Sequence, residues 1–216
     1  MALSTFSELK TSVANYLNRD DLTNVIPDFI TLTENRINRE LRARANVSRV
    51  TTTTTSGTDI YDFPADLIEL RSVSYVSGNN KTALSYMTPE SGTREYGTTA
   101  NGAPRSYSSF GKTIKIIPTP DAAYTVELVY YSTLASLSDS VTTNNILTEF
   151  PALYLYGACL EGAIFLNDSD EITRFDAIFN RTLEDIKQSE EKARYGGNVM
   201  TMTVQGDPGS LIRRGA

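Results

Sequence analysis

The sequence predicts an α+β protein with three parts: a four-helix bundle, a small antiparallel β domain inserted in it, and an extended C-terminal arm. Three observations predict this class. Apolar residues recur at helical spacing near both ends, β-branched residues alternate in the middle, and residues after 195 show no helical period. The bundle is expected over 1–46 and 146–195, the β domain with its linker over 47–145, and the arm over 196–216.

The N-terminal helical pair begins with STFSELKTSVANYLN, in which Thr5 and Glu8 have the spacing of a capping box. A longer helix follows, with Pro27 near its first position, where a missing N–H costs nothing. Its apolar stripe is predicted to face the core and to contain Ile26, Phe29, Ile30, Thr33, Ile37 and Leu41. The opposite, solvated face is expected to carry Glu34, Arg36, Arg39, Glu40, Arg42 and Arg44.

The middle of the chain, residues 47–132, changes character. VSRVTTTTT, DIYDFPADLIELRSVSYV, PRSYSSF, KTIKIIP and YTVELVYYS have the composition of strands and are separated by turn signals. They predict five or six strands in one small antiparallel sheet or barrel. The polar, Gly-rich stretch TPESGTREYGTTANGAP predicts a short helix and an exposed loop, and SLSDSVTTNN predicts a linker back to the helices.

Two helices are expected after this linker. One begins near Thr148 and ends near Asn167, and the other is capped by Ser169 and ends near Arg194. The first contains YLYGACLEGAIFL, which is apolar on nearly every side and must therefore be covered on nearly every side. The other three helices or a second subunit could provide that cover. The candidate residues for this packing are Tyr156, Gly157, Leu160, Gly162 and Ile164.

Composition narrows the possible functions. The net charge of -6 and the pI of about 4.8 disfavour a free-standing DNA-binding domain, which is usually basic. The chain has no histidine and one cysteine, Cys159, so the commonest general base is absent and a zinc site is not expected. We predict no metal, no cofactor, no signal peptide and no membrane-spanning helix.

Motifs that carry chemistry are not found in the sequence. Nucleotide-binding glycine loops, nucleophile elbows and metal-ligand clusters are absent. The acidic pairs Asp20–Asp21 and Asp168–Asp170 fit turn and capping roles, and sequence alone does not show two carboxylates facing each other across a cleft. We therefore predict no catalytic residues.

Arginines form a basic face on the second helix and just beyond it, and Arg49 extends this face. It could contact phosphate, or the acidic helix over 170–191, either within the bundle or in a neighbouring subunit. The candidate charged intersubunit face consists of Arg36, Arg39, Arg42, Arg44, Glu184 and Asp185.

The tail NVMTMTVQGDPGSLIRRGA alternates weakly between apolar and polar residues. It could be a fraying end, or an arm that adds to a partner's surface with its apolar side chains in pockets. The candidate partner-binding residues are Val199, Met200, Met202, Val204, Leu211, Ile212, Arg213 and Arg214.

Taken in order, these segments resemble a known family. NYLNRDDLTNVIPDFITLTENRINRELR resembles the N-terminal signature of bacteriophage head–tail adaptor proteins, also called tail accessory or gatekeeper proteins of short-tailed phages. DIYDFPADLIELRSV, IKIIPTPDAAYTVELVYY, FPALYLYGACLEGAIFL and RFDAIFNRTLEDIKQSEEKARYGG follow in that family's order and spacing. The resemblance covers residues 3–197.

The resemblance implies a structural virion protein, assembled in the host cytoplasm, without enzymatic activity. It implies a homo-oligomeric ring of about twelve copies between the portal protein and the tail nozzle protein, with tail fibres or spikes as further candidate partners. The helices would form the ring body and the β region would face the tail. The arm would bind the portal, and DNA would pass through the lumen without specific binding during packaging and genome ejection.

Two other function classes stay open at this point. One is a virion-associated enzyme that degrades the cell wall with a carboxylate pair. The other is a DNA-binding protein that uses the arginine face.

Overall fold

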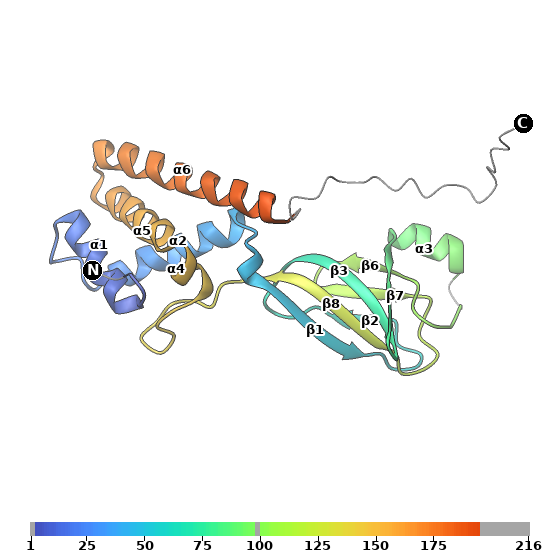
Figure 1. Ribbon diagram of the computed structural model, residues 1–216. Coiled ribbons are helices and arrows are strands. Elements are labelled where there is room, and N and C mark those ends of the chain that lie inside the picture. Colours follow the sequence, from blue (N-terminus) through green and yellow to red (C-terminus); the bar gives the residue numbers. More distant parts are fainter. Residues whose placement is uncertain (1–2, 98–99, 195–216) are drawn as a thin grey trace, which may run out of the picture.

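The computed structural model describes residues 3–97 and 100–194, in which helices from the two ends of the chain lie together and the β strands form a separate lobe (Figure 1). Five α-helices make up the helical body: α1 (Phe6–Leu17), α2 (Ile26–Glu40), α4 (Asn145–Glu149), α5 (Pro151–Leu166) and α6 (Ser169–Arg194). Helix α5 is central, because it contacts α1, α2, α4 and α6.

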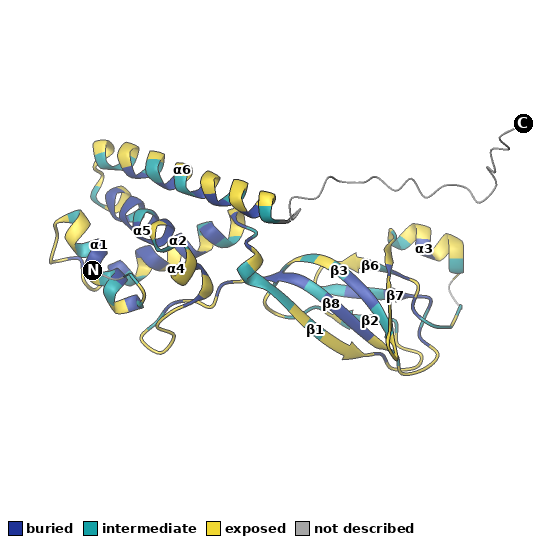
Figure 2. Ribbon diagram, in the orientation of Figure 1, coloured by how far each residue is buried: buried dark blue, intermediate teal, exposed yellow. Residues whose placement is uncertain are grey.

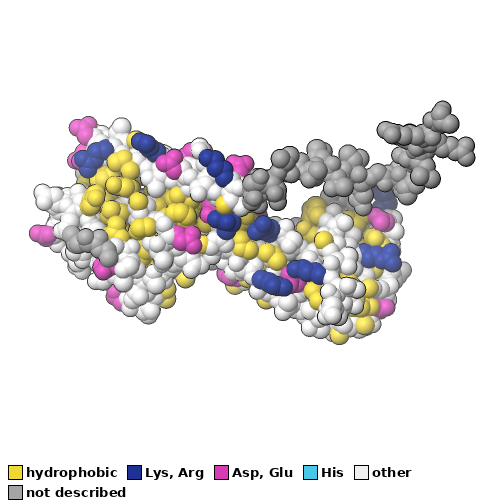
Figure 3. Space-filling view, in the orientation of Figure 1, with side chains coloured by type: hydrophobic (Ala, Val, Ile, Leu, Met, Phe, Trp, Pro, Cys, Tyr) yellow, Lys and Arg dark blue, Asp and Glu magenta, His cyan; other side chains and the backbone are white. Residues whose placement is uncertain are grey.

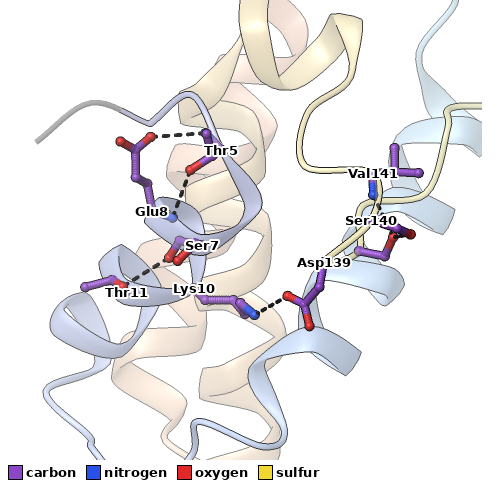
Figure 4. A network of polar contacts seen from close by, with 9 residues as sticks. Thr5, Ser7, Glu8, Lys10, Thr11, Asp139, Ser140 and Val141 are labelled. Carbon is purple, nitrogen blue, oxygen red and sulfur yellow. Dashed lines mark hydrogen bonds and ion pairs between the residues drawn. The ribbon is translucent and has the colours of Figure 1, made fainter.

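Local signals place α1 as the sequence predicts. The N–H of Glu8 donates to the Thr5 hydroxyl at 3.3 Å, and the Glu8 carboxylate accepts from the Thr5 N–H at 3.1 Å, which confirms the capping box (Figure 4). Lys10 forms an ion pair with Asp139 at 2.9 Å, so α1 is also tied to the segment that returns from the sheets (Figure 4).

The prediction of a four-helix bundle is wrong. The described residues contain six α-helices, because α4 is separate from α5 and α3 (Pro89–Tyr96) lies in the β region. The Asn144 side chain caps α4 by accepting from the Leu147 N–H at 2.9 Å, and Phe150 then leaves helical geometry with φ -132° and ψ 58°. Pro151 starts α5, since it needs no partner for an N–H. The sequence pattern merged these two helices into one.

The cap of α6 also differs from the prediction. The Asp168 carboxylate accepts from the N–H groups of Asp170 and Glu171, each at 3.2 Å, so Asp168 rather than Ser169 caps the helix.

The β lobe consists of two four-stranded sheets. The first has the order β1-β8-β3-β4, with β1 (Val47–Thr53), β8 (Thr125–Ser132), β3 (Leu67–Ser77) and β4 (Asn80–Ala83). The second has the order β2-β7-β6-β5, with β2 (Ile60–Asp62), β7 (Thr113–Ile117), β6 (Ser106–Phe110) and β5 (Ser85–Tyr86). The pairings between these strands are antiparallel except that of β5 with β6. A short 3₁₀ helix, Arg44–Asn46, joins α2 to β1.

The prediction of one small β insertion is therefore also wrong. Strands β2, β4 and β5 have four residues or fewer, too short for alternation to mark them. The two sheets enclose their own hydrophobic cluster, which includes Val73 and Leu128 from the first sheet and Ile114 and Ile116 from the second. A larger cluster fills the helical body around α5 (Figure 2).

Candidate functional site

Helix α5 is covered by the chain's own helices. Leu160 is buried, and Gly157 lies against Thr33 of α2 and Phe179 of α6, so closely that an added Cβ would collide with Thr33. Gly162 lies against Leu17 and Phe29. The remaining two of the predicted packing residues are more open: the Tyr156 ring meets Tyr16 edge-on at 6.2 Å, and Ile164 is 44% exposed.

Most of the basic face is paired within the chain. Arg36 contacts the carboxylates of Glu161 at 3.0 Å and Asp176 at 4.0 Å, and so joins α2 to α5 and α6. Glu161, a carboxylate on the largely apolar helix α5, is thus the partner of an arginine. Arg42 pairs with Glu69 of β3 at 2.9 Å. The Arg36 pairs therefore link helices of the body, and the Arg42–Glu69 pair links the end of α2 to the first sheet.

Arg44 and Arg49 are also paired. The Glu190 carboxylate of α6 accepts from the backbone N–H of Arg44 at 2.7 Å and from its guanidinium at 3.2 Å. Arg49 binds Glu127 at 2.6 Å, and Lys81 binds the other oxygen of the same carboxylate. The hydrogen bond from Lys81, assisted by Arg49, lowers the pKa of Glu127.

Arg39 differs from its neighbours. It is exposed and forms no ion pair with any residue in the described part of the chain. On α6, Glu184 accepts a hydrogen bond from Gln188 at 3.2 Å, and Asp185 is exposed and forms no ion pair among residues 3–97 and 100–194.

A buried carboxyl at the junction with the sheets was missed by the sequence analysis. Glu34, placed on the solvated face of α2 by that analysis, is only 2% exposed. Its Oε1 accepts from the Leu137 N–H at 2.8 Å and from the Tyr154 hydroxyl at 3.3 Å. Burial raises the pKa of Glu34, although these hydrogen bonds oppose the shift. Its position between Ile30 and Ile37, one turn from each, was the signal for a core-facing acid.

Other polar side chains hold the same returning segment. Asn38 accepts from the Leu134 N–H at 2.9 Å, and Asn144 donates to the Ala135 carbonyl at 2.9 Å and to the Tyr154 oxygen at 2.7 Å. The segment between β8 and α4 is thus fixed to α2 and α5 by buried hydrogen bonds, which sets how the sheets attach to the helices.

Two different apolar surfaces lie on the two flanks of α6. One is a groove of about 330 Å³ between α6 and the start of α5, whose apolar lining includes Phe150, Pro151 and Ile186. Glu149 and Asp185 also line it. On the other flank lies α2, whose Arg36 and Glu40 contact α6; Leu32 of α2 and Phe165 of α5 are 50% and 54% exposed. Figure 3 shows apolar side chains gathered beside α6, with charged groups around them.

The acidic pairs have structural partners. Asp21 binds the Arg19 guanidinium at 2.7 Å, and Asp168 caps α6. Within the described ranges, no three acidic, cysteine or histidine side chains gather in a cluster that could hold a metal ion. None of the helices described is long and apolar enough to cross a membrane. The predicted arm residues, from Val199 to Arg214, lie outside the described residues.

Comparison with known proteins identifies the family. The curated proteins contain no match to this chain. The sequence profile of the family described as SU10 adaptor protein matches residues 4–202, which agrees with the family resemblance drawn from the sequence segments. Because this match extends over most of the 216 residues, the chain belongs to the SU10 adaptor protein family of phage head–tail adaptors, and is a structural component of the virion.

Proposed function

We propose that this chain forms a homo-oligomeric ring between the portal protein and the tail nozzle of a short-tailed phage, and that DNA passes through the lumen of the ring. The observation that carries the proposal is the family match over residues 4–202. Adaptor membership indicates a structural role and contacts with other virion components. The number of copies, about twelve, is part of the proposal and follows from the family resemblance.

The helical body suits the wall of such a ring. Helix α5 is enclosed by four helices of the same chain, so the body has a complete core before any neighbour arrives. Buried hydrogen bonds and the Arg42–Glu69 pair at 2.9 Å fix its orientation to the sheets. In this proposal, the joint between helices and sheets transmits the position of one virion component to the next.

The parts of the chain take separate roles in this proposal. Residues 1–46 and 146–195 form the ring body, residues 47–145 face the tail, and residues 196–216 reach the portal. The net charge of -6 favours free passage of DNA, because a surface with few unpaired cations neutralises few phosphates. Four of the five arginines on the basic face are already paired to carboxylates.

The experiment is the mass of the complex formed when the purified chain is mixed with the portal of its own phage. Full-length chain and a chain truncated after Tyr195 are compared by native mass spectrometry. We expect a defined multi-copy complex with the full-length chain and a weaker one with the truncated chain. No complex with either version would refute the placement at the portal, and equal binding by both would refute the role of the arm.

A further inference from the structure

We propose that one flank of α2 docks into the α6 groove of the next copy, with Arg39 of one copy facing Asp185 and Glu149 of the other. This deepens the proposed ring and rests on it.

The arginines on and just after α2 differ in whether their own chain supplies a carboxylate. Arg36, Arg42 and Arg44 are satisfied by Glu161, Glu69 and Glu190 of their own chain. Arg39 is the member of this group left without an ion pair inside the described structure. Asp185 and Glu149 are exposed, and neither has an ion-pair partner in the described ranges. A cation and two carboxylates on the same body are thus available to a neighbour.

An apolar surface lies beside each of these charges. Leu32 lies seven residues before Arg39 on α2, so the two share one face of the helix. Leu32 is 50% exposed, and Phe165, 54% exposed, contacts Phe29 one turn before Leu32, with the rings tilted by 53° and their centroids 5.5 Å apart. The groove offers a complementary apolar floor of Phe150, Pro151 and Ile186.

The lengths agree. Leu32 and Arg39 are separated by two turns of α2, about 10 Å. The groove is lined on α6 from Thr182 to Ser189, which is also two turns and about 10 Å. Its volume of about 330 Å³ accommodates a protruding leucine with neighbouring atoms. The stretch of α2 from Leu32 to Arg39, here called the ridge, therefore fits the groove, with its cation beside the carboxylates of Asp185 and Glu149.

The position of α6 between these surfaces decides the symmetry. Asp176 and Lys187 point from α6 towards α2, where they contact Arg36 and Glu40, each at 4.0 Å. Asp185 and Ile186 line the groove on the other flank. The ridge and the groove are different surfaces on opposite sides of one helix, so copies must join head to tail. Head-to-tail contacts form a ring when the rotation between copies closes and an open filament when it does not, whereas a two-fold contact would stop at a dimer.

The experiment uses full-length chains with cysteines at the proposed contact. Arg39→Cys and Asp185→Cys chains are mixed at high concentration with a short bismaleimide, and products are separated by mass. We expect a cross-linked dimer from the mixture, none from either variant alone, and a ladder of higher species from the double variant. Wild-type chain is the reagent control, because Cys159 is buried. Arg39→Cys mixed with Glu184→Cys is the matched control, since Glu184 adjoins Asp185 but does not line the groove.

A charge swap measures the contact independently. Arg39→Glu and Asp185→Arg should each weaken self-association about ten-fold, and the double swap should recover most of that loss. Absence of the mixed cross-link overturns this inference, whether the free chain is monomeric or oligomeric. The ring proposal is decided separately by the portal complex: a multi-copy complex there without the cross-link would keep the ring and discard these surfaces.

Discussion

Replacing Gly157 by alanine tests how tightly α5 is enclosed. The new Cβ would lie well inside van der Waals contact with Cγ2 of Thr33 and at 3.1 Å from the Phe179 ring. Thr33 has little freedom to move, because it is fully buried and its hydroxyl donates to the Phe29 carbonyl at 2.8 Å. Two helices would have to separate, or Thr33 would have to give up its rotamer.

The expected change in the free energy of unfolding is the sum of two opposing effects. Overpacking a core site costs about 1–3 kcal/mol, and a stiff, hydrogen-bonded neighbour places this site in the upper half of that range. Alanine in place of glycine returns about 1 kcal/mol of helix propensity. We therefore expect a net loss of about 1–2 kcal/mol in the free energy of unfolding. For a chain of this size that lowers Tm by about 2–8 °C.

Gly162→Ala is the matched comparison on the same helix. Its new Cβ would meet Cδ1 of Leu17 at 2.5 Å, but this atom is the end of a flexible, half-buried side chain that can turn away. The propensity gain should then leave the variant within about 0.5 kcal/mol of wild type, or more stable.

Urea unfolding followed by circular dichroism measures both variants. Thr33→Ser in the Gly157→Ala background removes the colliding methyl group and keeps the hydroxyl, so at least half of the lost stability should return. Our reasoning about helix packing is refuted if Gly157→Ala is as stable as wild type, or if Gly162→Ala loses as much as Gly157→Ala.

Three further predictions concern the cap and the two buried carboxylates. Thr5→Ala should lower the free energy of unfolding by about 1 kcal/mol in urea titrations, because the Glu8 N–H loses its partner; no change would contradict the cap's role. Because the pKa of Glu34 is raised in the fold, its contribution is complete below its unfolded pKa and is lost as pH rises through the folded value. Glu34→Gln should therefore remove a fall in stability with rising pH, and an unchanged pH profile would count against this. Because the pKa of Glu127 is lowered, its contribution is present above its unfolded pKa and is lost as pH falls through the folded value. Glu127→Gln should therefore reduce the loss of stability at acid pH. If its profile of stability against pH instead stays parallel to that of wild type, Lys81 and Arg49 do not act through Glu127.

The elements with local signals could be predicted from the sequence. The Thr5–Glu8 box lies at the start of α1, Pro27 lies in the first turn of α2, and Asn167 ends α5 in a left-handed conformation. Each signal acts within one turn of helix, so no distant contact is needed to interpret it. The family resemblance likewise rests on short segments, taken in their order along the chain.

Contacts between distant segments could not be predicted in this way. The sequence shows that α5 is apolar but does not show which segments cover it. The structure places four helices of the same chain around it. Division of the strands into two sheets depends on pairings such as Arg49 of β1 with Val129 of β8, far apart in the chain. Short strands gain their stability from such partners rather than from their own pattern.

The sequence by itself determined the family, the starts of α1 and α2, the end of α5 and the basic character of the surface from Arg36 to Arg49. Only the tertiary structure decided which charged side chains on that surface form ion pairs within the chain. Ion pairs form between segments that folding brings within 4 Å, and the sequence does not contain that distance. Folding pairs Arg36, Arg42 and Arg44 inside the chain and leaves Arg39 free among the described residues. It also buries Glu34, since the segment from β8 supplies the N–H that its carboxyl accepts.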